Sequence, residues 1–213
     1  MGSTHCWIAE GQEPFSYVTM ITLIKYGNTN TYLIHGTSGN LLVDTDYAGT
    51  LQGFYRAIKT LDIKVGDITY ILATHYHPDH MGLVSELMNL GVKLVIMNTQ
   101  LDYVHYSDEI FSRMPQLGVK PIDESQARVV SIADSRAFLS ELGIEGEIMS
   151  TPSHSADSVT VMLNDGTTVT GDLEPQSYID AYADNEALKA DWEKVMSYHP
   201  HRICHAHANE VFL

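Results

Sequence analysis

Three histidines and one aspartate fall within six consecutive positions of the chain, in the pattern His-x-His-x-Asp-His. His75 and His77 are two residues apart, so on extended chain their imidazoles point the same way and can bind one ion. Pro78 disfavours helix at His77 and predicts a loop, in which Asp79 and His80 turn toward a second ion. Imidazole and carboxylate groups at this spacing favour zinc or another first-row divalent metal. The pattern therefore predicts a metal site.

The amino-acid composition argues against several kinds of binding partner for such a site. The chain has 213 residues, of which 11 are histidine, and 12 Lys and Arg stand against 27 Asp and Glu, a net charge of −15. This charge argues against binding to nucleic acid or to an anionic membrane surface. No segment approaches the ~20 apolar residues of a membrane span, and the first residues do not resemble a signal peptide. Two cysteines, Cys6 and Cys204, are too few for a disulfide scaffold. We expect a cytoplasmic protein that acts on a small molecule.

The elements that must position the histidines alternate between strands and helices. Apolar and β-branched runs predict strands over 15–26, 31–34, 41–43, 68–74, 93–97, 129–132, 147–150, 159–163, 167–170 and 202–206. Apolar residues at helical spacing predict helices over 50–61, 83–90 and 186–196. Strand-rich halves with helices between the strands predict a four-layer αββα sandwich, in which two mixed β-sheets are flanked by helices, within one domain over 1–213.

These features together resemble the metallo-β-lactamase superfamily of binuclear hydrolases. Its landmarks occur in order: Asn30–Ile34 and Leu42–Thr45 resemble the opening strands, Thr74–His80 the metal loop, Thr151–Ser158 the element with a further histidine, Thr170–Asp172 the strand end with a bridging carboxylate, and Ala206–Ala208 the final ligand. The resemblance covers nearly the whole chain, and it implies the same four-layer fold that the pattern of strands and helices predicts.

The resemblance also implies a set of metal ligands. Carried over by position, a first ion is held by His75, His77 and His154, a second by Asp79, His80 and His207, and Asp172 bridges them. For the last ligand, His205 would face the same side of a strand as His207, and His207 is preferred because small residues flank it. Asp44 resembles a carboxylate that holds a ligating imidazole, but it also fits a residue that caps a turn. Both roles of Asp44 stay open.

Such a site predicts hydrolysis. Two zinc ions, with iron or manganese as alternatives, would hold a bridging hydroxide that attacks a small ester, thioester or lactone, and Asp79 would orient it and carry a proton. The alternatives are a zinc β-lactam hydrolase, and a sulfur dioxygenase of the same superfamily that binds one iron through His75, Asp172 and His154. Residues 101–116 are either a lid over the substrate or an amphipathic helix that packs on the sandwich or on a second subunit. A homodimer stays open.

Overall fold

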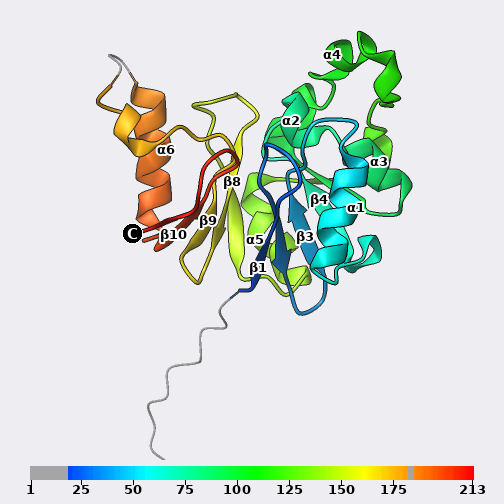
Figure 1. Ribbon diagram of the computed structural model, residues 1–213. Coiled ribbons are helices and arrows are strands. Elements are labelled where there is room, and N and C mark those ends of the chain that lie inside the picture. The colour runs from blue at the N-terminus through cyan, green and yellow to red at the C-terminus, as the bar shows by residue number, and fades with distance from the viewer. Residues whose placement is uncertain (1–18, 182–184) are drawn as a thin grey trace, which may run out of the picture.

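Two mixed β-sheets pack face to face in the computed structural model, which describes residues 19–181 and 185–213 (Figure 1). The first sheet contains β1 (Ile21–Ile24), β2 (Thr31–His35), β3 (Asn40–Val43), β4 (Ile68–Leu72), β5 (Lys93–Met97) and β6 (Arg128–Val130), in that order. The second, in the order β11-β10-β9-β8-β7, contains β7 (Gly146–Ser150), β8 (Val159–Leu163), β9 (Thr167–Val169), β10 (Arg202–Cys204) and β11 (Val211–Phe212). Each sheet combines parallel and antiparallel pairs.

Alternation along the strands divides the apolar side chains between the faces of the sheets. In β8, Val161 enters the core between the sheets, whereas Met162 packs on the outer face under α6 (Glu186–Ser197). Trp192 of that helix is buried in the same outer cluster. On the other side of the molecule, α1 (Leu51–Thr60) and α3 (Val84–Asn89) cover the first sheet. The four-layer sandwich predicted from the sequence is therefore confirmed.

One further helix closes the side of the sandwich. α5 (Ser135–Glu141) packs against β7, and its Phe138 and Leu139 are buried in the core between the sheets. It is not among the predicted helices, because seven residues give barely two turns of apolar periodicity. No helix in the described part of the chain is both long and apolar enough to cross a membrane.

The other predicted elements agree with the structure to within a few residues, and three differences bear on the site. The strand predicted over 15–26 starts in residues that are not described, and β1 is its described part. β10 ends at Cys204, so the residues predicted at 205–206 lie in a loop. The expected loop after His77 is a short helix, α2 (Pro78–Met81). His77 is extended, as predicted, but proline at the first helical position has its backbone angle already set for a helix.

The segment from Asn98 to Gln126 contains several short helical pieces. They are 3₁₀ turns at Asn98–Tyr103, Pro115–Leu117 and Glu124–Gln126 and one short helix, α4 (Asp108–Ser112). This segment projects above the first sheet at the end of the molecule where α2 lies (Figure 1). Other single 3₁₀ turns are Val65–Asp67, Ile132–Asp134 and Gln176–Tyr178.

Candidate metal centre

Five segments that leave strands at their carboxyl ends meet at one end of the sandwich. Asp44 follows β3 and His75 follows β4, and these two strands are parallel. His154, Asp172 and His207 follow β7, β9 and β10, which all run in one direction because β7 and β9 are each antiparallel to β8, and β10 is parallel to β9. The carboxyl ends of strands that run the same way lie at the same edge of a sheet. The topology therefore gathers side chains that are up to 163 positions apart in the sequence.

Backbone hydrogen bonds hold the loops of the two sheets against each other. The backbone N–H of Val159 donates to the carbonyl of Thr74 (2.9 Å), and that of Tyr76 donates to the Asp157 carboxylate (2.7 Å). Gly171 has φ +56°, and a Cβ on it would lie 2.5 Å from the hydroxyl oxygen of Thr74. Only glycine therefore lets the chain before Asp172 approach the histidine loop so closely.

All seven predicted ligands come together at this end. Their donor atoms form three groups, each within 4.8 Å: site 1, site 2 and a group that lies between them. Site 1 consists of His75, His77 and His154, site 2 of Asp79, His80 and His207, and the middle group of His75, His80 and Asp172. This is the same partition that the family resemblance implies.

The distances in these groups suit a metal ion. His154 Nε2 lies 3.3 Å from His77 Nδ1, and His207 Nε2 lies 3.3 Å from His80 Nε2. Nitrogen atoms bound to one zinc ion at about 2.05 Å in tetrahedral geometry are themselves about 3.3 Å apart. The buried His75 Nε2 atom has no hydrogen-bond partner among the described residues. Buried polar atoms are rarely left unsatisfied, so this atom fits a ligand whose partner is an ion.

The Asp172 carboxylate reaches both sites. Its Oδ2 atom lies 3.6 Å from His154 Nε2 and 3.9 Å from His75 Nε2. Its Oδ1 atom lies 3.2 Å from both His80 Nε2 and His207 Nε2. One oxygen therefore faces each site, which is the arrangement that a bridging carboxylate requires.

Electrostatics at the centre favour a cation. Burial, reinforced by the neighbouring His80, lowers the pKa of His75 to about 2, so its imidazole is neutral and Nε2 keeps a lone pair. Burial alone would lower the pKa of His80, but the Asp44 and Asp172 carboxylates outweigh it and raise that pKa to about 10. Burial would also raise the pKa of Asp172, yet the nearby His80, His207 and His75 hold it well below its usual range. Without an ion, a proton on His80 supplies the positive charge that these carboxylates attract.

The Asp44 carboxylate contacts Nδ1 of His80, the ring nitrogen that does not face Asp172. Its Oδ2 atom lies 2.9 Å from His80 Nδ1 and accepts a hydrogen bond from the Thr74 hydroxyl (2.9 Å), and its Oδ1 atom accepts one from the Thr74 backbone N–H (2.6 Å). Asp44 is buried and has φ +61°, a conformation that aspartate tolerates better than most residues. Because its carboxylate is bound to residues at least 30 positions away rather than to its own turn, the structure favours the role of holding an imidazole.

His205 and His207 lie in different surroundings. The His207 imidazole converges on site 2, with Nε2 also 3.2 Å from Asp79 Oδ2. Both histidines line a pocket of about 340 Å³ beside the centre, and His205 Nδ1 lies 3.2 Å from the Thr170 hydroxyl. The prediction that both lie on a strand is wrong, because β10 ends before either of them.

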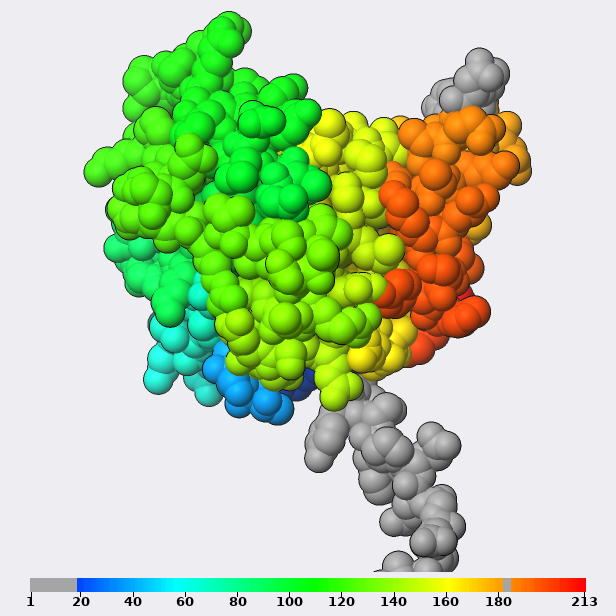
Figure 2. Space-filling model, turned by 180° about the vertical axis from the view of Figure 1, so that it is seen from behind, coloured from blue at the N-terminus to red at the C-terminus, as the bar shows by residue number. Residues whose placement is uncertain are grey.

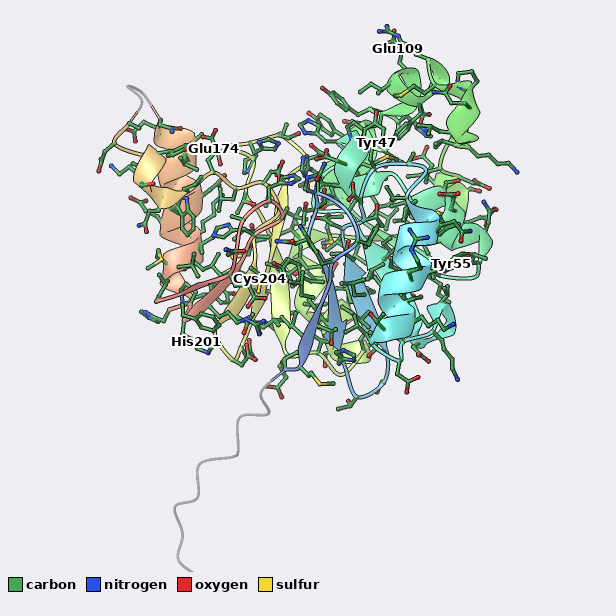
Figure 3. All side chains as sticks on the ribbon, viewed as in Figure 1. Tyr47, Tyr55, Glu109, Glu174, His201 and Cys204 are labelled. Carbon is green, nitrogen blue, oxygen red and sulfur yellow. The ribbon has the colours of Figure 1, made fainter. Side chains whose placement is uncertain are left out.

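The centre lies between two raised parts of the molecule. Figure 2 shows the surface hollowed between the segment around α4 and the segment around α6. In Figure 3, the labelled Tyr47 and Glu174 flank this end from opposite sides. The Tyr106 ring lies 5.3 Å from the His77 ring and is 56% exposed, whereas Phe111 is buried against Tyr47. Phe111 thus packs on the sandwich, while Tyr106 stays a candidate for the predicted lid.

Asn30 is a residue whose role the sequence did not reveal, although it belongs to a recognised landmark. Its side chain donates to the carbonyls of His205 and Ala208 (2.8 Å each), and its backbone N–H donates to the carbonyl of Ala206 (2.7 Å). It therefore ties the loop that carries His207 to the first sheet. No local pattern signals this contact, because its partners are more than 170 positions away.

We expect Asn30→Ala to weaken binding of one zinc ion by about tenfold to a hundredfold, because the backbone that carries His207 loses its anchor. Titration of metal-free protein against a coloured zinc chelator measures this. Asn40→Ala is the matched control, since its side chain also makes two hydrogen bonds to backbone, at the other end of the sheet. Equal zinc affinity in the two variants would refute the anchor.

Known proteins resemble this chain in sequence. The chain belongs to the metallo-beta-lactamase superfamily, whose family model matches residues 24–207. It is 27% identical over 183 residues to the beta-lactamase-like protein 2 homolog of Drosophila melanogaster, covering 86% of this chain and 59% of that protein. It is 28% identical over 141 residues to the atrochrysone carboxyl ACP thioesterase AacuM of Aspergillus aculeatus, covering 64% of this chain and 36% of that protein. The chain therefore spans less than two thirds of these relatives.

Solved structures share the fold. The metallo-beta-lactamase family protein TTHA1429 of Thermus thermophilus superposes with a TM-score of 0.66 at 16% identity, covering 90% of this chain and 74% of that one.

Proposed function

We propose that this protein is a zinc-dependent hydrolase with two metal ions, which cleaves a small thioester, ester or lactone. The observation that carries the proposal is the pair of three-residue donor groups that share the Asp172 carboxylate. Imidazole-rich donor sets suit zinc among the divalent metals, with iron and manganese as alternatives. The thioesterase named among the relatives supports a thioester as the first substrate to test.

Different residues would bind the metal ions and transfer the proton in such a reaction. His75, His77 and His154 would hold one ion, Asp79, His80 and His207 the other, and Asp172 would join them. Two bound ions supply an activated water molecule and polarise the carbonyl of the substrate. The Asp79 carboxylate is about one-third exposed beside His207, so it can orient the attacking water, take its proton and pass it to the leaving group. The pocket of about 340 Å³ that contains Leu173 and Pro175 would take the acyl group.

Metal analysis combined with an assay tests the proposal. We expect two zinc ions per chain by plasma mass spectrometry on protein purified without added metal. Removal of the metal with a chelator should lower the hydrolysis of butyryl-N-acetylcysteamine at least a hundredfold, on the order that removal of an electrostatic catalyst costs. Added zinc should restore the rate.

Other results would contradict the proposal. Full activity in metal-depleted protein would exclude this mechanism. One iron per chain, with oxygen uptake and no hydrolysis, would indicate the dioxygenase that uses His75, Asp172 and His154. Hydrolysis of β-lactams at a much higher kcat/KM than thioesters or lactones would replace the proposed substrate class.

A further inference from the structure

His205 is held in place from both its backbone and its ring. The carbonyl of His205 accepts hydrogen bonds from the Asn30 side chain (2.8 Å) and from the Tyr32 hydroxyl (3.0 Å). Its imidazole Nδ1 lies 3.2 Å from the Thr170 hydroxyl. A side chain that is fixed in this way loses little freedom when it binds a ligand, unlike a surface histidine on a mobile loop.

The Thr170 hydroxyl occupies one ring nitrogen of His205 and leaves the other free. The hydroxyl oxygen lies 3.2 Å from His205 Nδ1 and 3.4 Å from the carbonyl of Cys204. When the hydroxyl donates its single hydrogen to that carbonyl, it accepts from Nδ1, and Nε2 keeps a lone pair in the neutral imidazole. Among the described residues Nε2 has no hydrogen-bond partner, and His205 lines the pocket.

This pocket adjoins the metal centre. It is lined by His154, Asp172 and His207 from the centre, by Leu173, Pro175 and Ala208, whose side chains are apolar, and by Gly171 and Glu174. An acyl group whose carbonyl is placed at the metal centre would extend into it. His205 is then a fixed hydrogen-bonding group on a partly apolar wall.

We propose that His205 is a specificity-determining residue, whose Nε2 accepts a hydrogen bond from a donor on the acyl group, such as a hydroxyl. The inference rests on the proposed hydrolase function and adds the acyl chemistry that the site prefers. A pocket that is built to hydrogen-bond a substrate group discriminates against an analogue without that group, because a polar atom is then left unpaired.

A set of thioesters of equal chain length tests this inference in the zinc-loaded protein. The substrates are the butyryl, 2-hydroxybutyryl and 3-hydroxybutyryl thioesters of N-acetylcysteamine. We expect His205→Leu to lower kcat/KM about tenfold for at least one hydroxylated substrate and to leave the value for butyryl within about twofold. His205→Gln, whose amide oxygen also accepts a hydrogen bond, should recover part of the preference. His201→Leu is the matched control, since Figure 3 places His201 near the opposite end of β10 from the centre.

The outcomes separate the two proposals. An equal loss for all three substrates, or no loss for any, would overturn the role of His205 in specificity while hydrolysis itself stands. A fall in bound zinc from two ions to one in His205→Leu would make His205 a ligand and would also overturn the inference. If the wild-type protein with two zinc ions hydrolyses none of the thioesters, the proposed thioester function fails, and the inference fails with it.

Discussion

Asp172→Ala is expected to lower kcat/KM by about a thousandfold or more, the scale on which a central charge-stabilising group acts. Among the carboxylates that the structure describes, only that of Asp172 has one oxygen facing each site, at 3.2–3.9 Å from four imidazole nitrogens. Alanine would remove the negative charge between the two donor groups and with it the carboxylate that would bridge two ions bound there. We expect fewer than two zinc ions per chain by plasma mass spectrometry, together with the loss of thioester hydrolysis.

A matched control for this substitution lies at the opposite end of the same strand, β9. Asp165 precedes β9 as Asp172 follows it, and within residues 19–181 and 185–213 its carboxylate accepts hydrogen bonds only from the backbone of Thr19 and Thr167. Asp165→Ala should keep two zinc ions and the wild-type rate. If Asp172→Ala also kept both ions and an activity within tenfold of wild type, Asp172 would not bridge the sites.

Asp44→Ala is expected to lower the free energy of unfolding by about 3 kcal/mol in metal-free protein, the cost of removing one partner of a buried ion pair. The substitution leaves His80 Nδ1 and the Thr74 N–H and hydroxyl without their acceptor in a buried place. It also puts alanine at φ +61°, where aspartate is tolerated better. Urea unfolding followed by circular dichroism measures the loss.

The same variant should bind zinc about tenfold to a hundredfold more weakly at site 2, because the His80 ring is no longer oriented. Asp44→Asn separates the causes. Asparagine tolerates the left-handed backbone, and its amide oxygen can still accept from Thr74, so it should lose less stability than alanine while still weakening zinc binding. A stability within about 0.5 kcal/mol of wild type for Asp44→Ala, the range of neutral surface changes, would show that this contact contributes little.

The sequence alone determined the features that depend on local spacing. Apolar and β-branched runs predicted β2 and β8, and apolar residues at helical spacing predicted α1 and α6. The histidine motif after β4 and the landmarks after β7, β9 and β10 indicated the seven residues that the structure brings together. The spacing of apolar residues predicts strands and helices, because each such element is formed by residues close in sequence. The order of the motifs along the chain indicates the ligands.

The tertiary structure alone decided where His205 lies and which residues support the centre. β10 ends at Cys204, His207 lies at site 2, and His205 lines the pocket beside it without joining a donor group. The contacts of Asp44 with His80 and of Asn30 with the loop after β10 likewise join positions 36 or more apart. Such contacts depend on how the two sheets pack and where each strand stops, and no periodicity in the sequence encodes either.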